Sequence, residues 1–304
     1  MATDTEQQTR THAGAAVGTR LSSELAALAE RVREGIVEVR NGQGGGTGTV
    51  VRPDGLIVTN HHVVPGEGAH VTTPRGAKFA ARVVASLPER ALAVLKSDAS
   101  DLPWLPLGDS HALRVGELVL AVGHPLGVTG AATLGIFSGF GPIEGQGGRH
   151  FQEALLAAIE LRPGNSGGPL VNARGEVVGI NAMVLGPQTA LAVPSATAQR
   201  LIDTSSGRRQ TLGVQIGVAQ LPAALAARHA VEQTAVLIVL GVEDDGPAGQ
   251  AGLLPGDIIL RYNGQALQEP GDLAWQLAGA AEGVSVTLDL LRGGEPREVV
   301  VALR

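Results

Sequence analysis

Cysteine is absent from this 304-residue chain, which excludes disulfide bonds and thiol chemistry. Aromatic residues make up only 2% of the sequence, so its hydrophobic cores have to be aliphatic. No run rich in lysine and arginine occurs and the net charge is −6, so nucleic-acid binding has no electrostatic support. Histidines and carboxylates show no metal-ligand spacing, and the sequence therefore predicts no metal site.

Long apolar runs are absent as well. No segment reaches the roughly 18 apolar residues that a membrane-spanning helix needs. The first twenty residues are polar and lack the apolar core of a signal peptide. From the sequence as written we therefore expect a soluble protein with no membrane segment and a cytoplasmic location.

Glycine is plentiful, with 43 residues, and separates short apolar runs in the manner of an all-β protein. Helical spacing of apolar residues appears only at a few places, among them residues 21–34 and 195–203. The pattern predicts a mainly β protein with a flexible tail and two domains joined by a short polar linker. The expected boundaries are 1–20 for the tail, 21–203 and 211–304 for the domains, and 204–210 for the linker.

A glycine-rich turn around Ser166, in the sequence RPGNSGGPL, is the first candidate for chemistry. It has two interpretations. The serine could only hydrogen-bond its own backbone in a hairpin. Alternatively, its hydroxyl is a nucleophile, and the N–H groups of Gly164 and Ser166 converge on a developing oxyanion. The second interpretation requires a base, and His61 and His62, which close the apolar run LIVTN, are suggestive candidates.

Five blocks of sequence together resemble the HtrA (DegP-like) family of trypsin-like serine proteases. In chain order they are LIVTNHHVV, ALAVLKSD, LGDSHALRVGELVLAVGHPLG, TLGIFSGFG and PGNSGGPLVNARGEVVGINA. The resemblance implies a double β-barrel protease domain with the site between two six-stranded barrels, and no cofactor. It implies that His62 is the base, that Ser166 is the nucleophile, and that Gly164 and Asn165 form the oxyanion hole with Ser166.

The acid of the expected triad is missing. The family's block opens with aspartate, whereas this chain has Ala91 before Leu-Ala-Val-Leu-Lys. Glu89 lies two residues earlier, and Asp98 and Asp101 lie beyond the predicted strand, which makes them poor substitutes. Loss of this acid costs about four decades in kcat in well-studied triads. The chain is therefore either a slow protease or a protease fold kept for binding.

The resemblance also suggests where a substrate side chain binds. It places the pocket on the strand that contains Ala190, Leu191 and Ala192, whose lack of charge predicts a small or aliphatic side chain. Ordinary core packing is the alternative interpretation of these residues.

Residues 211–304 resemble a PDZ domain in the bacterial arrangement, most strongly over GVEDDGPAGQAGLLPGDIILRYNG. Such a domain captures a peptide C-terminus by strand addition. The resemblance assigns the carboxylate to the backbone N–H groups of Leu212, Gly213 and Val214. Leu273 and Leu277, four residues apart, could wall the side-chain pocket or simply pack in the core.

Two classes of function remain open at this stage. The first is an ATP-independent serine endopeptidase that acts on unfolded or damaged polypeptides. The second is a peptide-binding, chaperone-like protein whose protease domain is crippled by Ala91. Expected partners are unfolded polypeptides and peptide C-termini, and the resemblance implies a homotrimer and a family that usually works outside the cytoplasm.

Overall fold

The computed structural model describes residues 2–303 except 43, 145–149, 187, 206–209, 232, 269, 279 and 281–282. The chain divides into two compact units, Met1–Ile202 and Asp203–Arg304. Residues 206–209, most of the expected linker, lie outside the described residues.

The N-terminal segment differs from the expected loose tail. One helix, α1 (Ala2–Glu34), already begins at Ala2. The segment 2–20 contains two glycines and no proline, so nothing in it forces a helix to stop, although no apolar period announces one. Burial anchors the end of α1, where Leu28 and Val32 are 4% and 1% exposed. The described part of the chain has no helix both long and apolar enough to cross a membrane.

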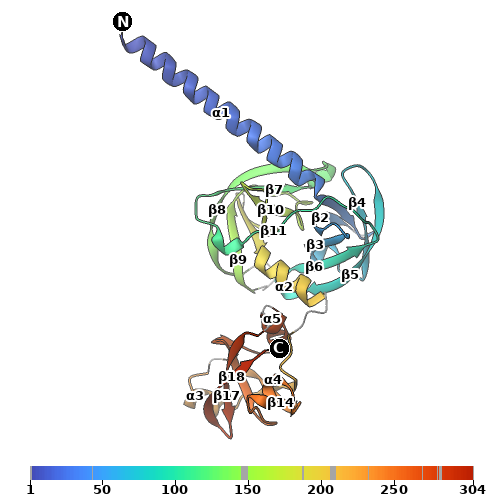
Figure 1. The fold of residues 1–304 in the computed structure, drawn as a ribbon, viewed down its shortest axis with the longest axis vertical. Helices are drawn as coiled ribbons and strands as arrows, with labels where there is room; N and C mark the ends of the chain where they lie inside the picture. The colour runs from blue at the N-terminus through green and yellow to red at the C-terminus, as the bar shows by residue number, and fades with distance from the viewer. Residues whose placement is uncertain are drawn as a thin grey trace. The chain divides into compact units, whose positions relative to one another are not determined.

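Twelve strands of the first unit form two closed six-stranded barrels, which confirms the predicted mainly β architecture (Figure 1). The first barrel has the order β1-β2-β3-β6-β5-β4. Its strands are β1 (Ile36–Arg40), β2 (Gly45–Arg52), β3 (Leu56–Asn60), β4 (Gly68–Thr72), β5 (Lys78–Leu87) and β6 (Leu92–Ser97). The core inside this barrel is aliphatic, as the scarcity of aromatic residues requires, and includes Val37, Val39, Ile57 and Leu95.

The second barrel has the order β10-β11-β12-β9-β8-β7. Its strands are β7 (Leu118–Gly123), β8 (Ala131–Glu144), β9 (His150–Ala158), β10 (Pro169–Asn172), β11 (Val177–Gly186) and β12 (Thr189–Pro194). The helix α2 (Ser195–Ser205) follows β12, and Ala198, Leu201 and Ile202 bury its apolar face. Short 3-10 turns lie in the connections of the unit, namely η1 (His61–Val63), η2 (Pro88–Arg90), η3 (Ser110–Ala112) and η4 (Pro125–Gly127).

The second unit is built on one six-stranded sheet, consistent with the expected PDZ domain. Its strands are β13 (Val214–Gln220), β14 (Ala235–Val242), β15 (Ile258–Tyr262), β16 (Gln265–Ala266), β17 (Ser285–Arg292) and β18 (Glu295–Ala302). Three helices complete the unit, namely α3 (Ala223–Arg228), α4 (Pro247–Gln250) and α5 (Pro270–Ala278). β13 is an edge strand of the sheet, with β14 as its one strand neighbour among the described residues.

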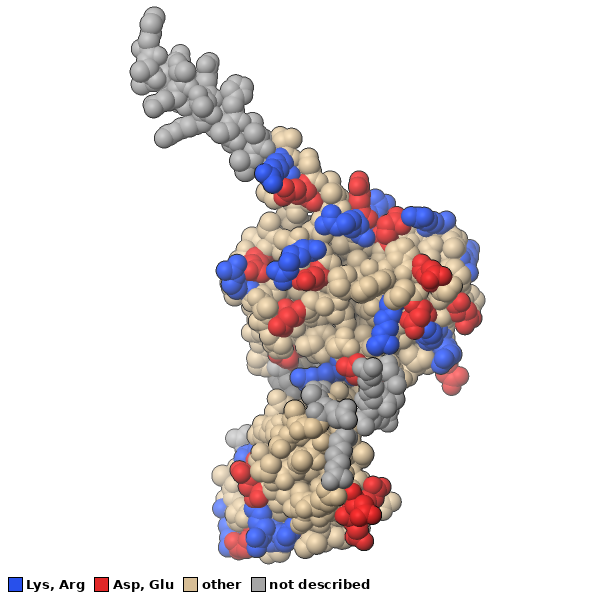
Figure 2. Space-filling view, viewed as in Figure 1, with Lys and Arg blue, Asp and Glu red and all other residues tan. Residues whose placement is uncertain are grey.

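Charged side chains of both signs are mixed on the face of the barrels seen in Figure 2. Many of them pair with each other at the surface, as Arg75 does with Glu34 and Arg114 with Glu117. Exposed pairs of this kind contribute little stability. The mixture leaves no single-sign surface on this face to attract a polyanion.

Candidate active site

The turn around Ser166 has a backbone that only glycine can supply at two positions. Gly164 and Gly167 have φ values of +104° and +83°. A Cβ on Gly164 would lie 2.4 Å from the carbonyl oxygen of His124, and one on Gly167 would lie 2.1 Å from that of Thr47. Both glycines are therefore required by conformation and by close backbone approach.

Hydrogen bonds from β2 of the first barrel hold this turn of the second barrel in place. The N–H of Thr47 donates to the carbonyl of Ser166 at 2.8 Å, and its hydroxyl donates to the carbonyl of Gly164 at 2.7 Å. The hydroxyl of Thr49 donates to the carbonyl of Gly167 at 3.1 Å. Both threonine residues are fully buried, so each bond is protected from water. The backbone around Ser166 is thus fixed at three carbonyl groups, those of Gly164, Ser166 and Gly167.

The backbone N–H groups of the turn differ in whether they are already hydrogen-bonded. The N–H of Asn165 donates to the carbonyl of Arg162 at 3.0 Å, and its residue is 4% exposed. Within the described chain, the N–H groups of Gly164 and Ser166 have no recorded acceptor. Two of the three residues expected at the oxyanion hole therefore keep an unengaged donor for a developing negative charge.

His62 lies in η1, the turn that directly follows β3, and it is exposed while the next residue, Val63, is buried. A Cβ on Gly46 would lie 2.8 Å both from the carbonyl oxygen of Ser166 and from a methyl group of Val63. The backbone of Ser166 and the residue after His62 thus lie against the same position at the start of β2. The structure thereby brings the two expected catalytic segments, one from each barrel, to one place.

Position 91 lies beside the histidine pair, as the sequence blocks predict. Ala91 is 2% exposed, and its carbonyl accepts the backbone N–H of His61 at 3.1 Å and the side-chain amide of Asn60 at 3.0 Å. The pairing of Asn60 with Leu92 in adjacent strands fixes this register. No carboxylate can come from Ala91 itself.

The neighbouring carboxylates do not replace the missing acid in this structure. Glu89 is exposed in η2 and makes no recorded hydrogen bond or ion pair among the described residues. Asp98 and Asp101 are also exposed, beyond the end of β6. A serine–histidine contact does exist nearby, because Nδ1 of His61 lies 2.8 Å from the hydroxyl of Ser86.

A pocket of about 270 Å³ contains Ser166, and it is lined by β11. Its wall includes Asn181, Ala182, Met183 and Val184. The backbone of Asn181 also holds the turn, since it accepts from the N–H of Gly167 at 2.9 Å and donates to the carbonyl of Gly168 at 2.9 Å. β11 therefore positions the nucleophile and forms the candidate side-chain pocket at once.

Ala190, Leu191 and Ala192, the residues expected to line that pocket, lie in β12 and are 2%, 0% and 2% exposed. Ala190 and Ala192 belong to the core of the second barrel. None of the three lines the pocket that contains Ser166. The structure thus favours core packing for these residues and gives the lining of that pocket to the strand before them.

His124, which no sequence pattern singled out, lies beside the Ser166 turn. The residue is 7% exposed, and its backbone N–H donates to the hydroxyl of Thr47 at 3.0 Å. Burial lowers the pKa of its imidazole, Glu38 opposes that effect, and Arg33 adds to it. Its partner Thr47 is 77 residues away in the chain, so no local pattern could have singled it out.

The second unit places Leu212, Gly213 and Val214 where β13 begins. Leu212 is 1% exposed and packs in the core, and its carbonyl accepts the N–H of Ala248 at 2.8 Å. Gly213 has a φ of +70°, and its N–H donates to the hydroxyl of Thr211 at 3.0 Å. A carboxylate bound by this segment would therefore have to displace a threonine hydroxyl. Leu273 and Leu277 of α5 are both buried in the core of the unit.

Comparisons with known proteins agree with this geometry. The model of the trypsin-like peptidase domain matches residues 46–180, and that of the PDZ domain matches residues 211–303. A solved structure named "HtrA-type protease AlgW with tripeptide" is 31% identical, with a TM-score of 0.60, and the match covers 92% of this chain and 97% of that one. A serine endoprotease from Yersinia pestis is 28% identical with a TM-score of 0.55, and the match covers 91% of this chain and 96% of that one.

Two curated relatives are each named "Probable periplasmic serine endoprotease DegP-like". The protein of Chlamydia trachomatis is 34% identical over 269 residues, and that of Brucella suis 36% over 270 residues, with 85% of this chain covered in both. The chain spans about half the length of these relatives, 53% and 52%. Their periplasmic location contradicts the cytoplasmic location expected from the sequence. That expectation depended on the absence of a signal peptide from the sequence as written.

Proposed function

This chain belongs to the HtrA family of trypsin-like serine proteases, and from that premise we propose that it is a slow serine endopeptidase. Its substrates are unfolded or damaged polypeptides. His62 removes the proton of Ser166, the hydroxyl oxygen attacks the scissile carbonyl, and the N–H groups of Gly164 and Ser166 stabilise the oxyanion. The protonated imidazole then donates its proton to the leaving amine, and water hydrolyses the acyl-enzyme.

The observation that carries this proposal is the anchoring of the Ser166 turn by β2. Thr47 and Thr49 bind three of its carbonyls, and the N–H groups of Gly164 and Ser166 are unengaged in the described chain. A turn that served only as a hairpin would not require its donors to stay unpaired. A pre-formed oxyanion hole supplies catalysis even when the base is poorly oriented.

A labelling experiment with a fluorophosphonate probe tests the proposal. The probe reacts with an activated serine, so we expect slow labelling of the native chain and none after Ser166→Ala or His62→Ala. Ser86→Ala is the matched control, because Ser86 contacts His61 but has no glycine turn beside it. Casein hydrolysis should follow the same order. Labelling that survives Ser166→Ala would refute the assignment.

The second candidate function, a peptide-binding, chaperone-like protein, is favoured by one observation. Position 91, where the family has an aspartate that orients the base and stabilises the imidazolium, is alanine in this chain. If Ser166 resists the probe while the chain still suppresses aggregation of an unfolded protein, this second function is the correct one. In either case we propose that the C-terminal unit binds peptide C-termini through the segment Leu212, Gly213 and Val214.

The compartment and the assembly belong to the proposal too. We place the protein outside the cytoplasm, as the names of its relatives suggest. Fractionation of cells that express the full-length natural protein tests this. A homotrimer stays a prediction from the resemblance, and sedimentation equilibrium of the chain tests it.

A further inference from the structure

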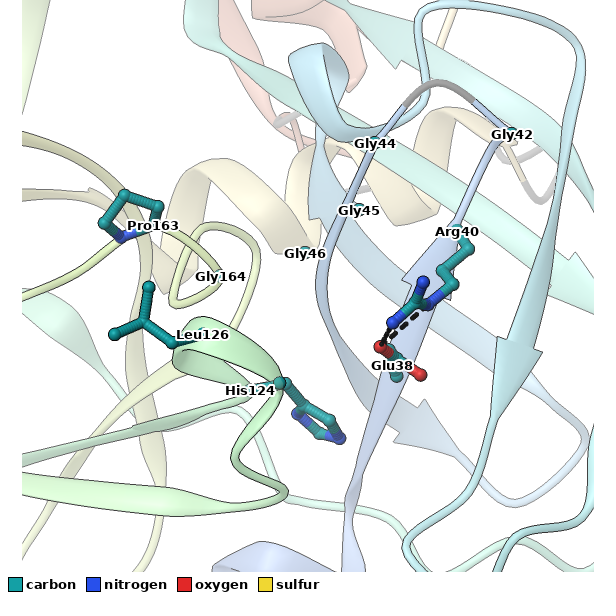
Figure 3. Close-up of a pocket in the computed structure, with 11 residues that line it drawn as sticks. Glu38, Arg40, Gly42, Gly44, Gly45, Gly46, His124, Leu126, Pro163 and Gly164 are labelled. Carbon is teal, nitrogen blue, oxygen red and sulfur yellow. Dashed lines mark hydrogen bonds and ion pairs between the residues drawn. The ribbon is translucent and has the colours of Figure 1, made fainter.

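A second pocket, of about 560 Å³, adjoins the Ser166 turn at Pro163 and Gly164. It is bordered by the outer face of β1, by the glycines at the start of β2, and by two turns of the second barrel. Figure 3 shows His124 and Gly164 on one side, and Glu38 and Arg40 on the other. Of the residues given a catalytic role above, only Gly164 lines this pocket.

The place of the pocket follows from the residues that it shares with the site. Pro163 lines both pockets, while Ser166 lines only the smaller one and Gly164 only the larger one. During the reaction the acyl half of the substrate is bonded to Ser166, so its side chain belongs in the pocket that Ser166 lines. The leaving half then extends across Gly164 into the larger pocket.

His124 lines this pocket, and its ring holds a buried polar atom that the described part of the protein does not satisfy. The residue is more than nine-tenths buried, and its Nδ1 has no hydrogen-bond partner among the described residues. Figure 3 shows its ring extending toward β1. Burial lowers the pKa of the imidazole, which favours the neutral form, and a neutral imidazole always keeps one nitrogen as an acceptor.

Glu38 supplies a second unused acceptor. Strand alternation puts Val37 and Val39 in the barrel core, and Glu38 and Arg40 on the outer face of β1. Nε and one terminal nitrogen of Arg40 both contact Oε1 of Glu38, at 2.8 and 2.6 Å, and Oε2 has no recorded partner in the described chain. The side chain of Arg40 is 67% exposed and that of Glu38 only 27%. The less exposed polar groups of the pocket are therefore acceptors.

We propose that this pocket binds a lysine or arginine side chain of the substrate on the leaving-group side of the scissile bond, and that Glu38 and His124 are its specificity-determining residues. The inference depends on the proposed endopeptidase function. A cationic side chain brings N–H donors to Oε2 of Glu38 and to the imidazole, and meets a carboxylate that Arg40 neutralises only from the solvent side. An acidic side chain would instead lie against Glu38.

Peptide binding tests the inference without any need for turnover. The full chain with Ser166→Ala is titrated with fluorescent peptides that carry one lysine, or in a matched set one glutamate, at each successive position. C-terminal amides prevent carboxylate capture by the second unit. At one position or two adjacent ones we expect the lysine peptide to bind about tenfold tighter than its glutamate partner.

The variants then locate the preference. Glu38→Gln and His124→Phe should each reduce the lysine preference, Glu38→Gln to less than about twofold. Glu117→Gln is the matched control, because this glutamate also pairs with an arginine but does not line the pocket. Equal affinities of lysine and glutamate peptides at every position, or a preference that survives Glu38→Gln, would overturn the inference.

The two proposals can fail separately. A lysine preference in a chain whose Ser166 does not react with the probe supports the subsite and refutes the endopeptidase. Probe labelling without any lysine preference refutes the subsite alone. The comparison of lysine and glutamate peptides uses a chain in which Glu38 and His124 are unchanged. The inference therefore stays falsifiable even if a Glu38 or His124 variant does not fold.

Discussion

Restoring the missing acid with Ala91→Asp is the perturbation that bears most directly on catalysis. Ala91 has φ 56° and ψ 26°, in the left-handed region, where aspartate and asparagine are the non-glycine residues most often found. Its carbonyl already binds the N–H of His61 and the amide of Asn60. The substitution therefore introduces a carboxylate next to the base and leaves the backbone contacts of the position unchanged.

The size of the expected gain comes from two opposing effects. Replacement of the acid by its amide costs about four decades in kcat in a complete triad, or about 5–6 kcal/mol of transition-state stabilisation. Against this, a carboxylate at a position that is 2% exposed is desolvated, which is costly until a partner is close. We expect kcat/KM to rise by two to four decades, and each decade corresponds to about 1.4 kcal/mol of transition-state stabilisation.

The assay compares kcat/KM for casein or a fluorogenic peptide between the native chain, Ala91→Asp and Ala91→Asn. Asparagine has the same size and the same tolerance of the left-handed backbone, but it cannot offset the charge of the imidazolium. Only Ala91→Asp should gain activity, and the rate of probe labelling at Ser166 should rise in parallel. Equal gains from both variants, or no gain while Ser166 still reacts with the probe, would refute the assignment of position 91 as the acid position.

Three further outcomes are expected. Thr47→Val removes the hydroxyl that binds Gly164 and His124 and should lower kcat by about tenfold or more with little change in KM, whereas Thr47→Ser should retain most activity. Asp257→Asn breaks a pair with Arg292 at 2.7 Å and should lower the free energy of unfolding of the C-terminal unit by about 2–4 kcal/mol in urea titrations. Burial raises the pKa of Asp257, but hydrogen bonds from Arg292 and from the N–H of residue 254 outweigh that effect and lower the pKa overall. The stability that this pair contributes is therefore present above about pH 4 and is lost as the pH falls toward the folded pKa. An unchanged urea midpoint between pH 7 and pH 3 would contradict this pH dependence. Finally, amidation of a peptide's C-terminus should weaken its binding to the C-terminal unit by at least about tenfold, and equal affinity of acid and amide would exclude a carboxylate site there.

Much of the architecture could be predicted because it depends on the local order of apolar residues and glycines in the sequence. Glycine-separated apolar runs indicate strands, and the turn around Ser166 requires its glycines whatever surrounds it. The start of α1 could not be predicted in this way, since the segment 2–20 has helix-compatible residues without an apolar period.

Features that depend on contacts between residues far apart in the sequence could not be predicted. The alternation of residues in a strand does not tell which of two adjacent strands lines a pocket. β12 was therefore expected to line the pocket of Ser166, which β11 lines in the structure. The left-handed backbone of Ala91 and the burial of His124 follow from packing between segments far apart in the chain. The absence of aspartate at position 91, by contrast, could be read directly from the sequence.

The bonds from Thr47 and Thr49 to the Ser166 turn have a consequence for the newly made chain. These partners are separated by more than 110 residues, and the turn is also held by Asn181 from β11. On the ribosome, the first barrel emerges with a histidine but no serine to activate. The Ser166 turn gains all of these bonds only after β11 has been synthesised and has joined its barrel. For the endopeptidase proposed above, we therefore expect no self-digestion of the growing polypeptide until nearly all of the protease unit has been made.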